Sequence, residues 1–197
     1  PEDGDGHGSH TASTTAGNSL NATMVAPTLD FTRPISGVAP HANIIIYDVC
    51  YENNVTLQGS CAFVATTAAT EQAILDGADV INFSIGGGED PYGETTELAF
   101  LEAYNAGVFV STSAGNEGPG ASTVGHLGPW VSASAAATHN RALFNSLVDL
   151  TGGDTTPPAD ITGKGFTSGY GPADIVYAGD YGDPLCPLGA FPAGTFA

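Results

Sequence analysis

Basic residues are scarce in this sequence. Only three of its 197 residues are Lys or Arg (Arg33, Arg141 and Lys164), against 21 Asp and Glu, so the formal net charge is −18. Binding to nucleic acid or to an anionic membrane surface depends on clustered basic side chains, so the composition argues against both partners. The acidity does not exclude a folded core, because 42% of the residues are hydrophobic and only 12% are charged.

Long apolar runs are also missing. No stretch approaches the roughly 18 consecutive apolar residues that read as a membrane-spanning helix. No secretory signal peptide opens the sequence, which begins with Pro1 rather than Met. We therefore expect a chain without a membrane span that is an internal piece of a longer protein.

Cysteine is too rare for a disulfide scaffold, with only three residues. Cys50 and Cys61 flank a polar loop and either close a small disulfide or remain two free thiols, and Cys186 has no obvious partner within the chain. The low lysine content, the acidity and the candidate disulfide favour an exported, extracellular protein.

The order of apolar segments predicts the fold class. Buried β-branched strands are expected at residues 43–49, 79–85 and 108–113, and helices at residues 62–75 and 94–105. Alternating strands and helices with this spacing predict right-handed βαβ units, hence an α/β fold with a parallel sheet covered on both faces. In such sheets the functional groups lie at the carboxyl ends of the strands, which Gly86 and Gly115 follow here.

The pattern changes in the last quarter of the chain. Residues 151–172 are rich in Gly and Pro and show no helical periodicity, and residues 173–179 are a candidate strand. We therefore expect one domain over residues 1–150 and a linker with the beginning of a second domain over residues 151–197.

Two histidines open a short helix expected at residues 7–17. The positive end of a helix disfavours the charged form of an imidazole, so His7 is a candidate general base near neutral pH. Taken by themselves, His7 and His10 are equally compatible with a metal-binding pair or with solvated side chains.

Glycine-rich turns follow two of the strands. Asn116 lies in one turn, where its amide is able to stabilise an oxyanion or to satisfy the turn itself. The glycines after residues 80–85 allow an extended substrate to lie alongside, or simply end a core strand.

Taken together and in order, the strings GHGSHTAS, SGVAPHANIIIYDVC, VINFSIGG and FVSTSAGNEGPG resemble the subtilisin-like serine proteases, or subtilases. The resemblance covers residues 3–141. It implies a three-layer subtilisin-like fold with a parallel central sheet, incomplete at both ends. It is closest to the branch with an inserted protease-associated domain, whose truncated start would fall in residues 151–197.

The resemblance implies a role for individual residues. His7 matches the catalytic base, Asn116 the oxyanion-hole residue and His10 a structural histidine. The substrate-binding strand and the opposite pocket wall, with a carboxylate near the pocket base, match Ser84, Ile85, Gly86, Ser113, Ala114, Gly115 and Glu117.

Two members of the Asp-His-Ser triad have no match. No Asp-[Thr/Ser]-Gly segment precedes His7, and Asp3 and Asp5 lie too close to it; no Gly-Thr-Ser-Met-Ala string surrounds Ser132 or Ser168. We therefore expect the triad Asp and Ser to lie outside this chain, in a secreted serine endopeptidase that acts on polypeptides. The chain alone is expected to be inactive.

Other expectations follow. The chemistry requires no cofactor, and a structural calcium ion is compatible with the family but has no assignable residues.

The missing Asp-bearing strand would leave a sheet edge exposed, which favours self-association of the chain. The alternative functions are a non-catalytic metal-binding module and a degenerate protease with a structural role.

Overall fold

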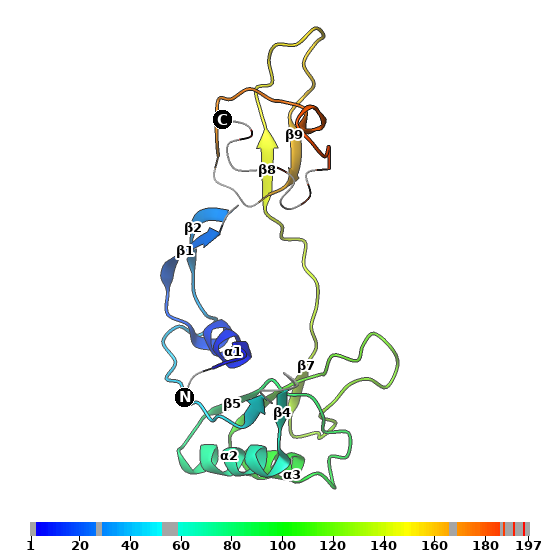
Figure 1. Ribbon diagram of the computed structural model, residues 1–197. Coiled ribbons are helices and arrows are strands. Elements are labelled where there is room, and N and C mark those ends of the chain that lie inside the picture. The colour runs from blue at the N-terminus through cyan, green and yellow to red at the C-terminus, as the bar shows by residue number, and fades with distance from the viewer. Residues whose placement is uncertain are drawn as a thin grey trace. The chain divides into compact units, whose positions relative to one another are not determined.

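The structure is a computed structural model that describes residues 3–26, 29–52, 59–165, 169–185, 187, 191 and 195. The chain divides into two compact units (Figure 1). Unit 1 contains Pro1–Ala22 and Arg33–Arg141, and unit 2 contains Thr23–Thr32 and Ala142–Ala197.

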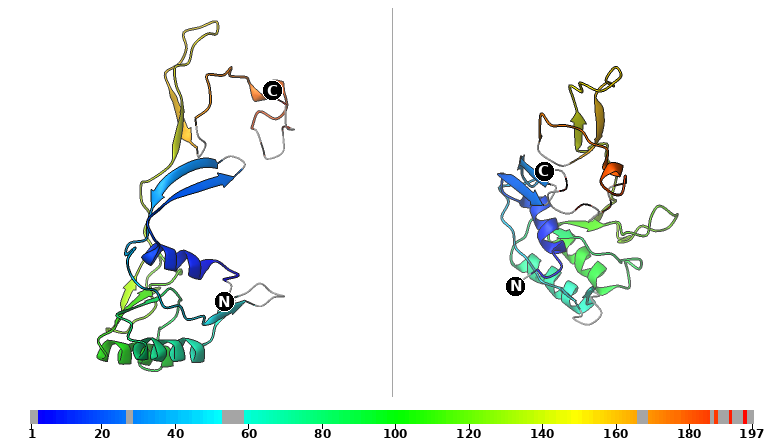
Figure 2. Two further views of the ribbon diagram at one scale, coloured as in Figure 1. Left: turned by 90° about the vertical axis from the view of Figure 1, so that its left-hand side faces the viewer. Right: turned by 45° about the horizontal axis from the view of Figure 1, so that its top comes forward.

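Unit 1 is built around a three-stranded parallel sheet of order β5-β6-β7. The strands are β5 (Val80–Phe83), β6 (Phe109–Ser113) and β7 (Ser132–Ser134). Helix α2 (Phe63–Leu75) precedes β5, and α3 (Thr95–Asn105) connects β5 to β6. The two helices lie side by side on one side of the sheet, and the views of Figures 1 and 2 place α1 on the other side. The α/β class and the βαβ order expected from the sequence are thus confirmed.

The core of unit 1 lies between α3 and the sheet. Phe100, Ala103, Val108 and Val110 form a buried apolar cluster, and the ring of Phe83 meets that of Phe100 edge-on with centroids 4.9 Å apart. These side chains come from α3, from β5 and β6, and from the turn that joins α3 to β6. Their burial therefore packs the helix against the two neighbouring strands.

Helix α1 (His7–Ala16) has few apolar residues and is stabilised locally. The Asp3 carboxylate accepts hydrogen bonds from the backbone N–H groups of Gly6 (2.9 Å) and Ser9 (2.6 Å), which caps the first turn. At the other end the N–H of Gly17 bonds to the carbonyl of Ser13 at 2.9 Å. The helix expected at residues 7–17 is confirmed.

A disulfide hairpin precedes α2. Strands β3 (Cys50–Glu52) and β4 (Gly59–Cys61) are antiparallel, with Cys50 directly opposite Cys61, and a disulfide joins the two residues. Of the two alternatives left open by the sequence, the structure therefore shows the disulfide. Cys186 lies outside the described residues.

The strand expected at residues 43–49 was wrong. This segment has no regular secondary structure, and Ile44, Ile45 and Ile46 are 48%, 50% and 65% exposed. A β-branched sequence favours an extended backbone, but a strand also needs a neighbour to satisfy its N–H and C=O groups. Among the described residues no strand pairs with this segment.

Unit 2 contains short antiparallel pairings. Strands β8 (Phe144–Leu147) and β9 (Ile161–Lys164) pair with Leu147 opposite Ile161. Strands β1 (Leu20–Ala26) and β2 (Leu29–Ile35) also pair, and their described residues from Thr23 to Thr32 belong to this unit. Because β8 pairs with β9, the unit begins before residue 151; whether residues 151–197 start an inserted domain stays a prediction.

The strand expected at residues 173–179 was also wrong. Ile175, Val176 and Tyr177 belong to no strand and are exposed, and the segment leads into a 3₁₀ turn, η1 (Ala178–Asp180). As at residues 43–49, local β-propensity has no pairing partner here among the described residues. None of the described helices has the length and apolar character needed to cross a membrane.

Candidate active site

The predicted substrate-binding residues lie where β5 and β6 end. The two strands are parallel, with Phe83 opposite Thr112, so the chain leaves the sheet at neighbouring positions in both. Residues 84–86 follow β5 directly, and Ser113 is the last residue of β6, with Ala114 and Gly115 immediately after it. The structure thus brings the two predicted pocket walls to one edge of the sheet, as parallel topology requires.

The segment after β6 is held by backbone hydrogen bonds on both sides. The N–H of Ala114 donates to the carbonyl of Ser134 (2.9 Å), and the carbonyl of Ala114 accepts from the N–H of Gly125 (3.1 Å). Gly115 has a φ of +90°, and its N–H donates to the Ser113 hydroxyl at 3.0 Å. A left-handed backbone at this point is accessible to glycine at little cost, which explains the residue type.

Asn116 and Glu117 follow this turn on the surface. The Asn116 N–H donates to Glu117 Oε2 at 2.7 Å, and this carboxylate lies against Gly115. The Asn116 side chain makes no hydrogen bond within the described part of the chain. Its amide is therefore available to a ligand, and the alternative that it satisfies its own turn finds no bond to support it.

Gly86 lies opposite, after β5. A methyl group at Gly86 would meet open space. The backbone around this residue is thus accessible from one side, as an extended ligand pairing with the chain would require.

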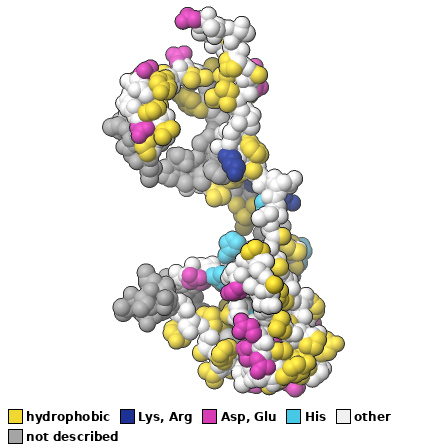
Figure 3. Space-filling model, turned by 90° about the vertical axis from the view of Figure 1, so that its right-hand side faces the viewer, with side chains coloured by type: hydrophobic (Ala, Val, Ile, Leu, Met, Phe, Trp, Pro, Cys, Tyr) yellow, Lys and Arg dark blue, Asp and Glu magenta, His cyan; other side chains and the backbone are white. Residues whose placement is uncertain are grey.

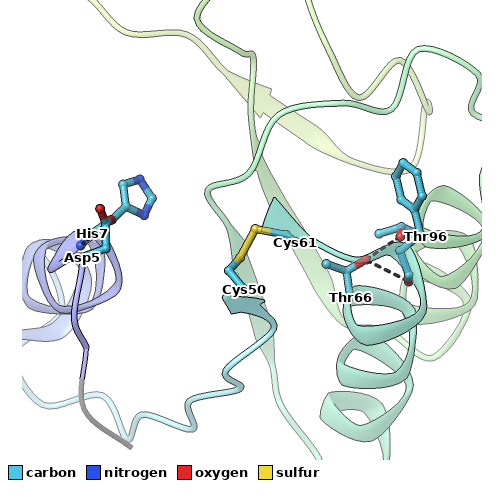
Figure 4. Close-up of a disulfide and its surroundings, with 7 residues drawn as sticks. Asp5, His7, Cys50, Cys61, Thr66 and Thr96 are labelled. Carbon is cyan, nitrogen blue, oxygen red and sulfur yellow. Dashed lines mark hydrogen bonds between the residues drawn. A yellow bond between two sulfur atoms is a disulfide. The ribbon is translucent and has the colours of Figure 1, made fainter. Parts of the chain in front are cut away.

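His7 is the first residue of α1 and is exposed (Figure 4). Gly6 before it has a φ of +84°, and the N–H of His7 reaches Asp5 Oδ2 at 3.3 Å. The imidazole makes no side-chain hydrogen bond among the described residues, so neither Asp3 nor Asp5 orients it as a triad aspartate would. Among the described residues, no hydrogen bond connects His7 or His10 to Asn116.

Asp3 has a different task. Its hydrogen bonds from Ser9 and then Gly6 hold the pKa of the Asp3 carboxyl below its ordinary value, because they stabilise the ionised form. This carboxylate is therefore committed to capping α1.

The disulfide lies in the same unit. Figure 4 shows the Cys50–Cys61 bond beside the N-terminal end of α2, where the Thr66 and Thr96 hydroxyls form a buried hydrogen bond of 2.8 Å between α2 and α3. The disulfide thus joins β3 to β4, and the threonine pair joins α2 to α3. Ser132 lies in β7, and Ser168 lies outside the described residues.

Sequence reasoning missed one polar cluster. His126 Nδ1 lies 2.6 Å from Glu97 Oε1, and His126 Nε2 lies 2.8 Å from the carbonyl oxygen of Ile85. His126 is 4% exposed and Glu97 is fully buried. The one available signal was the spacing of Glu97 with Phe100 and Ala103, which places it on the buried face of α3.

The charges around His126 determine its protonation. Burial lowers the pKa of His126, but the hydrogen bonds to Glu97 and Ile85 and the negative charges of Glu97 and Glu94 outweigh burial and raise it above its ordinary value. The cluster borders a small cavity of about 30 Å³, which Ile85, Gly86 and Glu97 also line.

No group of three or more His, Cys, Asp or Glu with a metal-binding arrangement occurs among the described residues. On the face shown in Figure 3, acidic side chains are spread over unit 1 and basic side chains are few. This distribution agrees with the net charge of −18.

The fold and the site together define a class: an α/β protein with an accessible backbone segment and an exposed amide donor just after the carboxyl ends of two parallel strands, and with a histidine at the start of a separate helix. A model of the subtilase family matches residues 1–178. The chain belongs to this family of subtilisin-like serine proteases.

Relatives in Arabidopsis thaliana are subtilisin-like proteases too. The chain is 40% identical to subtilisin-like protease SBT1.6 over 146 residues, 36% identical to SBT4.15 over 190 residues and 34% identical to SBT1.2 over 195 residues. These alignments cover 72%, 92% and 96% of the chain but only 18%, 24% and 24% of the relatives. The chain thus spans about a quarter or less of the length of these relatives.

Proposed function

We propose that this chain is part of a secreted serine endopeptidase that hydrolyses peptide bonds, with His7 as its general base and Asn116 as its oxyanion donor. The observation that carries the proposal is the parallel register of β5 and β6, in which Phe83 lies opposite Thr112, directly before residues 84–86 and 113–116. Family membership supports it. The exposed Asn116 amide and the open space at Gly86 supply two of the features that peptide hydrolysis needs.

The mechanism assigns one task to each residue. A serine Oγ outside this chain attacks the peptide carbonyl, and His7 accepts its proton. The carbonyl oxygen becomes a tetrahedral oxyanion, to which the Asn116 side-chain N–H donates. His7 then returns the proton to the leaving amine as the C–N bond breaks. The segments after β5 and β6 hold the substrate backbone, with Glu117 at the pocket.

The missing triad members have a place in this proposal. The edge of β5 and the exposed isoleucines at residues 44–46 are apolar surfaces that a further strand would cover. We assign the triad aspartate to such a strand in the longer protein. We assign the triad serine and the rest of an inserted protease-associated domain to other parts of the longer protein, and any structural calcium site would lie there too.

A fluorophosphonate probe tests the proposal on the full-length protein. This reagent reacts covalently with an activated serine, so we expect labelling in the wild-type protein and its loss in a His7→Ala variant, with His41→Ala as the exposed-histidine control. Peptide hydrolysis should follow the same pattern. Absence of labelling in correctly folded wild-type protein would instead favour a degenerate protease or a metal-binding module.

The isolated chain provides the complementary measurement. Because it lacks a nucleophile in the required context, the purified 197-residue chain should cleave casein no faster than buffer does. Hydrolysis that disappears in His7→Ala would show that the triad serine and aspartate lie within this chain.

A further inference from the structure

The buried pair of His126 and Glu97 contacts the predicted substrate-binding segment directly. His126 Nε2 bonds to the carbonyl of Ile85, and the backbone N–H groups of His126 and Leu127 donate to the carbonyls of Gly87 (2.7 Å) and Gly88 (3.0 Å). His126 thus holds the segment through both its ring and its backbone.

The pair also fits closely against this segment. At Gly88 a Cβ atom would collide with Glu97 Oε1 and with His126 Nδ1, whereas at Gly86 it would meet open space. The backbone at residues 85–88 therefore has one face against the His126–Glu97 pair and, at Gly86, one face open to a ligand. A movement of the pair has to move this backbone.

The hydrogen bonds of the His126–Glu97 pair depend on its protonation state. Both ring nitrogens of His126 face oxygen acceptors: a carboxylate at Nδ1 and a carbonyl at Nε2. With a neutral imidazole and an ionised Glu97, one ring nitrogen would direct its lone pair at an oxygen, whichever tautomer formed. Both contacts are satisfied only when the pair retains the additional proton.

Few other polar groups near His126 are able to replace its bond to Glu97. The acidic groups acting on His126 are Glu97 in α3 and Glu94 just before it. Its aromatic neighbours are Phe83 from β5 and Phe100 from α3, and Thr66 from α2 lines the same cavity. Glu97 Oε2 is buried without a partner among the described residues, so the carboxylate depends on His126.

We propose that His126 and Glu97 form a positioning pair whose proton holds the backbone at residues 85–88 in its substrate-binding conformation, so that substrate affinity falls when this proton is lost. This inference rests on the proposed function. It concerns the alkaline side of the pH profile, where the pair loses this proton.

The direction of the effect follows from the raised pKa of His126. Its stabilising contribution is fully present below pH 6.5, the ordinary value, and is lost as the pH rises through the higher value in the folded protein. Since the segment binds the substrate backbone in the ground state and in the transition state alike, the loss should appear in KM rather than in kcat.

The decisive variant is Glu97→Gln in the full-length protein. A glutamine at this position is able to donate its amide hydrogen to a neutral Nδ1, so Nε2–H remains bonded to Ile85 at every pH. In the wild-type protein we expect KM for a peptide substrate to rise about two- to tenfold across the titration of His126, the factor that corresponds to one net hydrogen bond. In Glu97→Gln the KM profile should be flat over that range. Glu102→Gln, an exposed change on the same helix, should retain the wild-type profile.

A spectroscopic measurement is independent of catalysis. NMR of the imidazole should show the pKa of His126 above 6.5 in the wild-type protein and lower in Glu97→Gln. Amide exchange at residues 85–88, after correction for its intrinsic pH dependence, should accelerate with the same midpoint in the wild-type protein only. Identical KM profiles in wild type and Glu97→Gln, or exchange that does not follow the titration of His126, would overturn the positioning role.

The two proposals fail differently. If fluorophosphonate labelling is absent but the exchange at residues 85–88 follows His126, the proposed function is wrong and the coupling of the pair to this segment stands. If labelling and hydrolysis are normal but KM ignores Glu97→Gln, the positioning role is wrong and the peptidase stands.

Discussion

Asn116 is exposed three residues after the end of β6, and its side-chain amide makes no hydrogen bond to another described residue. In an enzyme of the proposed kind, such a donor stabilises charge that exists only in the transition state. Substituting Asn116 with Ala in the full-length protein should therefore lower kcat by roughly 10²–10³ with little change in KM, the size measured for the oxyanion asparagine of a subtilisin.

The control is Asn140→Ala, another exposed asparagine, which should leave both parameters unchanged. Steady-state kinetics on one peptide substrate are sufficient. A kcat that is equal in Asn116→Ala and wild type would mean that other groups stabilise the oxyanion.

Asp3 illustrates a residue whose role is local. Its carboxylate caps α1 through Ser9 and Gly6, and its pKa is held below the ordinary 3.8. The stabilisation is therefore present above pH 3.8 and is lost as the pH falls through the lower value in the folded protein. In Asp3→Ala we expect a slightly lower melting temperature at neutral pH that converges with wild type in acid.

Thermal unfolding by circular dichroism measures this difference, with Asp48→Ala, an exposed aspartate outside any helix, as the control. A melting temperature that differs from wild type by the same amount at pH 2 and pH 7 would contradict the capping role.

Among the elements, the β3–β4 hairpin is the one held covalently. The disulfide closes a loop between residues that are eleven positions apart, so it removes conformational freedom from the unfolded chain. The double substitution Cys50→Ser with Cys61→Ser should lower the free energy of unfolding by up to about 3 kcal/mol, the loop-entropy estimate for a ring of roughly this size.

Urea unfolding with and without dithiothreitol provides the measurement and its own control. The reductant should destabilise the wild-type protein and leave the double variant unaffected. Equal sensitivity of both proteins to dithiothreitol would show that this bond contributes nothing to stability.

For the whole molecule, net charge and exposed apolar surface have opposite effects on self-association. The isoleucines at residues 44–46 are about half exposed or more, and Val80 in β5 is 59% exposed. A net charge of −18 keeps copies apart until salt screens it. We therefore expect the isolated chain to self-associate, increasingly so between low salt and about 1 M salt, where the Debye length falls to about 3 Å.

Light scattering across this salt range is the test. Ile45→Lys, which adds a charge to the exposed apolar segment, should reduce association. Ile175→Lys in unit 2 adds the same charge elsewhere and is the control for the change in net charge. A monodisperse monomer at all salt concentrations would show that these surfaces do not mediate association.

Much of this protein was determined locally. The helices at residues 62–75 and 94–105 and the strands ending near Phe83 and Ser113 were predictable, because periodicity and glycine placement act over a few neighbouring residues. The same holds for the positions of His7 and Asn116 at a helix start and a strand end. Their order in the sequence was sufficient to indicate the family.

The tertiary structure decided the rest. Residues 43–49 have strong β-propensity but no pairing partner among the described residues, and β9 forms because β8 lies beside it. The contact of His126 with Glu97 and Ile85 joins positions 29 and 41 residues apart. Strand pairing and the burial of charged groups depend on what the fold brings alongside, and no local pattern in the sequence carries that information.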